Sequence, residues 1–263
     1  MRLPLLLLAG GLGLVGCAQA TSSGGNGNGV DASNNNPQDG NNNPMPDAFV
    51  RPPDGSVITL DSSVPLDSAL PTTKTLSETT SPTDDGDGIG CAALNSGGTA
   101  VVYTAAQSFY RVFQLSSFGI TGTFHVTNVD YVVEEAKNSP SMKISVGTYS
   151  GTVGGNTLTT SDISLTASTT ATLPSITAAT SEDAVVSAEI TGNLIVEIDQ
   201  VTAGSTSNKV VYFPGANAGG ETEPGYVMSA SCSAFTVPTS MDSLASSANL
   251  TDSDLLITVT GTY

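Results

Sequence analysis

Apolar and polar side chains alternate with a period of two along much of the chain after residue 100. In the segment NLIVEIDQ, residues 193–200, the side chains of Leu194, Val196 and Ile198 fall on one face. This period is typical of a half-buried β-strand. Similar strand-like runs occupy residues 109–115, 122–135, 141–150, 162–169, 184–190, 209–213 and 255–263.

The phase of this alternation slips once, inside the run GTFHVTNVDYVVEE. Phe124 and Val126 share one face of that strand, whereas Val129 and Tyr131 share the other. A β-bulge adds one residue to a strand and so exchanges the faces of all residues that follow it. We therefore expect a bulge near Thr127–Asn128.

Turn-forming segments rich in Gly, Pro and Asn separate the runs, for example GTVGGN, ITGN and PGANAGGETEPG. Short strands with such turns predict an all-β protein, here a single β-sandwich or jelly-roll-like domain over residues 91–263. Only TSMDSLASSA, residues 239–248, has the pattern of a short helix.

The chain before this domain has a different composition. Tracts such as SNNNPQDGNNNPMPD, and a single aromatic residue, Phe49, leave little apolar surface between residues 18 and 90. Such a segment cannot bury enough surface to offset the entropy lost on ordering. We expect residues 17–90 to be a disordered linker, with an interaction tail as the alternative.

The first residues have the features of a targeting segment. Arg2 precedes an apolar run, residues 3–16, that is too short to span a bilayer core of about 30 Å but has the length of a signal-peptide core. The run ends in Leu14-Val15-Gly16-Cys17, which resembles the lipobox of bacterial lipoproteins.

This resemblance implies that residues 1–16 are a signal peptide, that cleavage occurs before Cys17, and that Cys17 then carries acyl chains. Two or more acyl chains anchor a protein stably, whereas one gives only marginal binding. Because Ala18 follows the cysteine and no acidic residue stands there, we expect a cell-envelope location at the outer membrane or cell surface. The alternative is an ordinary secretory signal with a chance cysteine.

Two cysteines remain when Cys17 is set aside. Exported proteins fold in an oxidising compartment, so Cys91 and Cys232 are expected to form one disulfide. The sequence contains no C-x-x-C motif and no Cys/His cluster, and we expect no zinc site.

The net charge of the chain indicates which partners it can bind, and says less about its fold. The formal net charge is −17, from 7 basic and 24 acidic residues. Such a surface repels the phosphate backbone, so nucleic acid is not expected as a partner. The acidic residues are dispersed, which favours solubility.

A second resemblance covers roughly residues 100–263. The segments SFYRVFQLSSFGITGTFHVTNVDY (108–131) and VYFPGANAGGETEPGYVMSASCSAFTVPTSMDSLA (211–245) are similar to a domain that recurs in large secreted modular bacterial proteins. That domain is an accessory β-domain without an established activity, so the resemblance implies an accessory role here.

Candidate catalytic groups are few. His125 is the only histidine, and its position within a strand predicts that it faces solvent, on the side opposite to Phe124 and Val126. Glu134 and Glu135 point to opposite faces of the same strand. Glu221 and Glu223 lie in a Gly/Pro-rich loop where their carboxylates could converge, as a glycosidase would require.

Two loops have the composition of binding sites. The stretch ANAGGETEPGY contributes Asn217, Glu221, Glu223 and Tyr226 as candidate binding residues, because loops on a rigid sandwich often carry recognition. A long structural turn is the alternative for this stretch.

The run DDGDGIG offers Asp84, Asp85 and Asp87 as weak calcium candidates. When it is aligned as an EF-hand, however, Leu94 stands where the bidentate Glu belongs. We therefore expect no metal, and an acidic hinge at the domain border instead.

These observations predict a membrane-anchored surface lipoprotein that presents a non-enzymatic binding, adhesion or accessory module. Its expected partners are the membrane, through the lipid, and an extracellular or periplasmic protein or glycan of unknown identity; no cofactor is expected. The alternatives are a structural coat component of the envelope, and a hydrolase that uses a carboxylate site.

Overall fold

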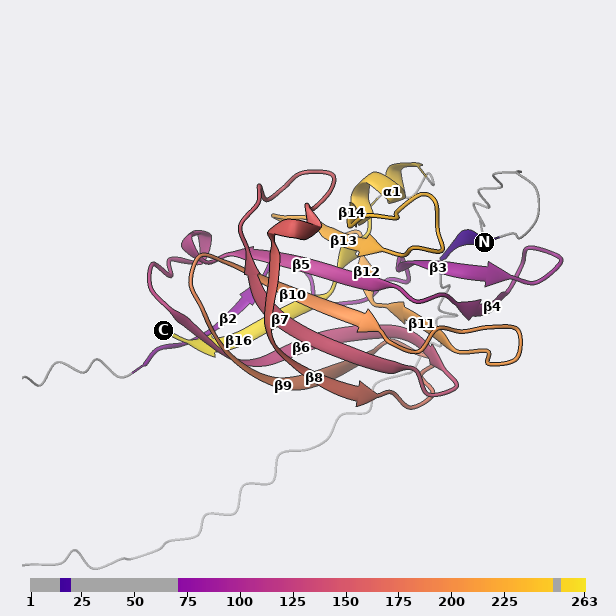
Figure 1. Ribbon diagram of the computed structural model, residues 1–263, viewed down its shortest axis with the longest axis horizontal. Helices are drawn as coiled ribbons and strands as arrows, with labels where there is room; N and C mark the ends of the chain where they lie inside the picture. The colour runs from indigo at the N-terminus through magenta and orange to yellow at the C-terminus, as the bar shows by residue number, and fades with distance from the viewer. Residues whose placement is uncertain (1–14, 20–70, 248–251) are drawn as a thin grey trace, which may run out of the picture. The chain divides into compact units, whose positions relative to one another are not determined.

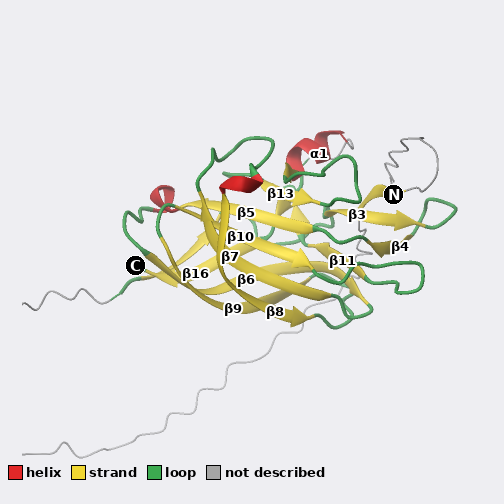
Figure 2. Ribbon diagram, in the orientation of Figure 1, coloured by secondary structure: helices red, strands yellow, loops and turns green. Residues whose placement is uncertain are grey.

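Antiparallel strands make up most of the structure, a computed structural model that describes residues 15–19, 71–247 and 252–263, the first of these by backbone alone (Figures 1 and 2). An all-β fold was predicted and is confirmed. The described part of the chain contains one α-helix, α1 (Met241–Ser247), inside the range expected for it. No helix among the described residues is long and apolar enough to cross a membrane.

Two large sheets face one another. The first has the order β14 (Thr239–Ser240), β13 (Gly225–Met228), β5 (Ser108–Gln114), β10 (Asn193–Gln200), β7 (Ser141–Tyr149), β8 (Ile163–Thr172). The second has the order β11 (Val211–Pro214), β6 (Phe124–Lys137), β16 (Ile257–Thr262), β2 (Thr73–Ser77), with β9 (Thr180–Ile190) also paired to β6.

Two smaller sheets complete the arrangement. One consists of β1 (Val15–Gln19), β3 (Ile89–Leu94) and β4 (Val101–Thr104), and the other pairs β12 (Ala216–Asn217) with β15 (Asp254–Leu255). Short 3₁₀ turns lie at Leu115–Phe118 and Thr160–Asp162.

The main core lies between the two large sheets and follows the period-two pattern. Leu194, Val196 and Ile198 of β10 enter it, as the alternation predicted. The other face of β10 is not solvated at Ile195, which is buried in a second cluster with Tyr110 and Tyr226. The expectation of a half-buried strand was therefore wrong at this position, because loops cover the outer face of the central strands.

The expected bulge in β6 is confirmed. The pairing of β6 with β9 shifts register between Val126 and Asn128, and the pairing with β16 shifts at the same place. Thr127 is thus the inserted residue. The insertion lets Phe124 and Tyr131 both reach the core although they differ by an odd number of positions.

Residues 71–90 belong to the folded unit, which corrects the boundary expected at residue 91. Pro71–Tyr263 belongs to a single compact unit, in which β2 pairs with β16 and Leu76 is fully buried. The alternation pattern did not predict this strand because its segment TKTLS has low hydrophobicity, with Leu76 as its one large apolar residue. The rest of the predicted linker, residues 20–70, and residues 1–14 of the predicted signal peptide lie outside the described residues.

The predicted disulfide between Cys91 and Cys232 is confirmed, with the two Cα atoms 5.8 Å apart. Cys91 lies in β3 and Cys232 in the turn after β13, so the bond fastens the small sheet to the first large sheet. Both residues are buried in the main core.

Removing this bond with the double substitution Cys91→Ala, Cys232→Ala is expected to lower the free energy of unfolding by about 4–5 kcal/mol. The reason is that the bond spans 141 residues, and the chain-entropy model gives losses of that size for long loops. Chemical denaturation of the oxidised and substituted proteins measures the difference. A loss below about 1 kcal/mol would show that the bond does not constrain the unfolded chain.

Candidate functional site

A fully buried arginine lies at the centre of the first large sheet. Arg111 is in β5 between Phe109 and Phe113, so its side chain points to the inner face like theirs. It stands opposite Gly225 of β13. A Cβ atom at residue 225 would lie 2.6 Å from Cβ of Leu255, so only glycine allows β13 and β15 to approach this closely.

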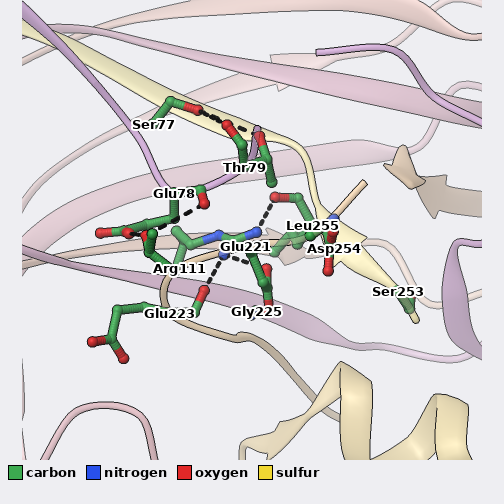
Figure 3. Close-up of polar contacts among 12 residues, drawn as sticks. Ser77, Glu78, Thr79, Arg111, Glu221, Glu223, Gly225, Ser253, Asp254 and Leu255 are labelled. Atoms are coloured by element: carbon green, nitrogen blue, oxygen red, sulfur yellow. Dashed lines mark hydrogen bonds and ion pairs between the residues drawn. The ribbon is translucent and has the colours of Figure 1, made fainter. Parts of the chain in front are cut away.

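The guanidinium of Arg111 is held by three oxygen acceptors (Figure 3). Its Nη1 donates to Oε2 of Glu221 at 2.5 Å and to the backbone oxygen of Glu223, and its Nη2 donates to the backbone oxygen of Leu255. The side chain of Glu221 is itself only 5% exposed. This is a buried ion pair, whose charges compensate one another where water cannot.

Two further carboxylates gather around Glu221. One side-chain oxygen each of Glu221, Asp242 and Asp254 lies within 4.8 Å of the other two. Glu221 comes from the loop between β12 and β13, Asp242 from α1 and Asp254 from β15. We call these three residues the acidic cluster.

Asp254 is the most deeply placed member of the acidic cluster, with no exposed surface. Its Oδ2 accepts a hydrogen bond of 2.6 Å from the backbone nitrogen of Gly220, whose φ of 92° is readily available only to glycine. Its Oδ1 is buried and receives no hydrogen bond from an N–H or hydroxyl group, and the same is true of Oδ1 of Asp242. Both aspartates instead lie beside the carboxyl group of Asp252, and Asp242 also lies beside that of Glu221. Buried oxygens without a partner are rare in folded proteins.

The cluster is short of positive charge. Burial raises the pKa of Glu221 to about 7, although the Arg111 guanidinium acts to lower it. Burial, with the charge of nearby Asp252 as a second cause, raises the pKa of Asp254 to about 6. Burial and hydrogen bonding to Asp252 raise the pKa of Asp242 well above its ordinary range. One guanidinium therefore does not balance the carboxylates that surround it.

A surface hollow of about 420 Å³ lies beside one member of the cluster, Asp242. Asp242 lines the hollow together with Asn156, Pro224, Ser240 and Ser243. Of the acidic cluster, Asp242 alone lines the hollow, which places hydroxyl and amide groups beside that carboxylate.

The predicted binding loop is used mainly for structure. Asn217 is buried, and its Nδ2 donates to the backbone oxygens of Ser81 and Thr83. Tyr226 lies in β13 and is fully buried, which corrects its expected place in an exposed loop. Glu221 faces Arg111, while Oε1 of Glu223 accepts a hydrogen bond of 3.5 Å from Gln114, so the two carboxylates serve different partners.

The weak calcium candidates also hold backbone. Oδ1 of Asp84 accepts a hydrogen bond from the nitrogen of Ala216, and Oδ2 of Asp85 accepts one from the nitrogen of Ala218. The backbone oxygen of Asp87 accepts from Oγ of Ser253. Asp84 and Asp85 thus fasten the segment before β3 to β12 and the residue after it, and Asp87 fastens it to the residue before β15.

The remaining candidates lie apart from the cluster. His125 is exposed on β6, as expected, with Nδ1 3.6 Å from Oε1 of Glu189. Glu134 and Glu135 do diverge: Glu134 is buried and accepts a hydrogen bond from the nitrogen of Gly88, whereas Glu135 pairs with Lys137.

Sequence reasoning missed Asp242 and Asp254. No motif connects positions 221, 242 and 254, and the cluster forms only because β12 pairs with β15 and α1 follows β14. The one available signal was Arg111, a lone charge between Tyr110 and Val112 in a strand-like run, and its acidic partner in the structure is Glu221.

Comparison with protein-family models, with curated proteins and with solved structures found no match. The interpretation of the site therefore rests on its own geometry.

Replacing Arg111 with Met is expected to lower the free energy of unfolding by about 3–5 kcal/mol, because it leaves Glu221 and two carbonyls buried without their partner. The double variant Arg111→Met, Glu221→Gln should recover part of that loss. Chemical denaturation measures both. Lys143→Met, which removes an exposed cation from β7, is the matched control and should change stability by less than about 0.5 kcal/mol. Equal losses in the Arg111 and Lys143 variants would contradict the buried ion pair.

Glu134 predicts a pH dependence of stability. Burial, and next the charge of Asp84, raise the pKa of Glu134 from its ordinary value near 4.5 to about 9. Between pH 4.5 and 9 the folded state therefore holds a proton that the unfolded state has released. The contribution of Glu134 to the free energy of unfolding is complete below pH 4.5, and it falls as the pH rises until it is lost above pH 9. Wild type should lose stability relative to Glu134→Gln between those values, by at most about 1.4 kcal/mol per pH unit.

Denaturation midpoints at pH 5, 7 and 9 measure this difference, with Glu135→Gln as the control. A constant difference between wild type and Glu134→Gln across that range would show that Glu134 is ionised in the folded protein.

Proposed function

We propose that this chain is a lipid-anchored lipoprotein of the bacterial cell envelope, and that its β-sandwich is a non-enzymatic binding or accessory module. The observation that carries the anchoring is the sequence Leu14-Val15-Gly16-Cys17 at the end of an apolar run too short to span a bilayer. The polar segment between Cys17 and Pro71 is then the tether that joins the lipid to the folded unit.

The arrangement of the side chains supports a binding or accessory role. Glu221, the best carboxylate for a hydrolase, is engaged with Arg111, and the only histidine lies on the surface of β6 beside Glu189. Catalysis by a carboxylate pair needs both groups to face one substrate bond. Glu221 and Glu223 instead hold Arg111 and Gln114, respectively.

Strand β1 bears directly on the anchor. It pairs with β3 over Val15–Gln19, with Cys17 opposite Cys91. Processing before Cys17 removes Val15 and Gly16 and leaves only Cys17–Gln19 able to pair. If those residues stay on β3, the sandwich lies against the membrane; if they leave β3, the tether sets its distance from the membrane.

The anchor is tested by Cys17→Ser in a bacterial host. We expect the substitution to abolish labelling by a fatty-acid analogue and to move the protein from the membrane fraction to the soluble fraction, because the acylated sulfur is lost. Ala18→Ser, which keeps the cysteine, is the control and should remain labelled. Membrane association that survives Cys17→Ser would rule out the lipid anchor.

The binding role is tested with the full chain against arrays of glycans and of envelope proteins. A binding module should give a saturable, selective signal that denaturation of the protein removes. Sedimentation of the same sample separates the alternatives, since concentration-dependent self-association without array binding would favour a coat component and contradict the binding role.

A further inference from the structure

We infer that the acidic cluster, Glu221, Asp242 and Asp254, is a binding site for a divalent metal ion of the calcium class. This inference is independent of the proposed lipid anchor and of the binding role.

The donor atoms fit a hard cation. All three side chains offer carboxylate oxygens, which are the ligands that Ca²⁺ prefers, at bond lengths of about 2.3–2.6 Å. Two oxygens bound to one such ion can be at most about 5 Å apart. The three oxygens lie within 4.8 Å of one another, so one ion can contact all of them with little movement of the chain.

Two buried carboxylate oxygens of the acidic cluster have no hydrogen-bond donor. Asp254 is fully buried, its Oδ2 is fixed by the nitrogen of Gly220, and its Oδ1 has no hydrogen-bond donor. Oδ1 of Asp242 is also buried without a donor. Leaving a buried acceptor unsatisfied costs about 1–3 kcal/mol, and more when it is charged. A metal ion bound between these side chains satisfies both oxygens at once.

The neighbouring groups hold the ligands in place. Glu221 receives Arg111 on Oε2 and the nitrogen of Gly225 on Oε1 at 3.2 Å, which fixes its carboxylate plane. Hydrogen bonds of this kind orient metal ligands and raise affinity. Asp252 lies close enough to affect Asp242 and Asp254 and supplies a fourth negative charge.

The hollow beside Asp242 supplies the remaining requirements of such a site. Ca²⁺ takes six to eight oxygen ligands, more than three carboxylates provide, and commonly completes its shell with water. The hollow opens to solvent and is lined by Ser240 and Ser243 as well as by Asp242. An ion bound at Asp242 would therefore face solvent on the side of the hollow, with room there for bound water.

The bound ion would connect three parts of the fold: α1, β15 and the loop before β13. The elements in these parts are short: α1 has 7 residues and β15 has 2. Binding to the folded state alone stabilises a protein in proportion to the logarithm of ligand concentration. The expected role is thus structural, as a cross-link between these three segments beside Arg111.

The test uses the full chain with its disulfide intact, first freed of metal with a chelator and then titrated with CaCl₂. We expect calorimetry to show saturable binding, and the melting temperature to rise by several degrees. Asp242→Asn should weaken binding by at least about tenfold and abolish the rise in melting temperature. In chelator this variant should be at least as stable as wild type, because one of the crowded charges is gone.

Asp254→Asn should also lose the response to calcium. Asp183→Asn, which removes the same charge from an exposed position on β9, is the matched control and should keep it. The inference is overturned if CaCl₂ neither binds nor changes the melting temperature of wild type, or if both cluster variants retain the full response. It is also overturned if MgCl₂ raises the melting temperature of wild type and of Asp242→Asn by the same amount, since such a rise would come from general screening of charge.

Discussion

Burial of the Arg111 guanidinium is the constraint on which the surrounding structure depends. A cation without access to water needs compensation, and a single carboxylate and two backbone oxygens provide it at Nη1 and Nη2. To supply those oxygens, the loop before β13 must fold inward and β15 must turn the carbonyl of Leu255 toward β5. Gly225 makes that close approach sterically possible. The conformations of the loop before β13 and of β15 are thus both linked to the burial of the Arg111 charge.

The ion pair between Arg111 and Glu221 leaves the acidic cluster with more negative than positive charge. Glu221 balances Arg111, but Asp242 and Asp254 are drawn into the same region by α1 and β15. Their buried oxygens lack donors, and burial raises the pKa of Asp254 and Asp242. A cluster with these properties destabilises the folded chain unless protons or a cation occupy it. The inferred calcium site resolves this imbalance with the ligands already present.

Polar residues that resemble a binding or metal motif in the sequence serve here to join segments. Asp84, Asp85 and Asn217 exchange hydrogen bonds between the stretch before β3 and the strand β12. These contacts, together with β2, bring residues 71–90 into the folded unit. If the proposed anchor at Cys17 exists, the tether is therefore shorter than composition alone indicated, and the sandwich lies nearer to the membrane.

The sequence by itself determined the all-β fold, most strand positions, the bulge at Thr127 and the disulfide partners, because period-two alternation, turn residues and cysteine count are properties of near neighbours. It also predicts the lipid anchor. Only the tertiary structure decided that β2 belongs to the fold, that Tyr226 is buried, and that Glu221, Asp242 and Asp254 meet. Those outcomes depend on which strands pair and in what register, and these are set by packing between segments far apart in the chain.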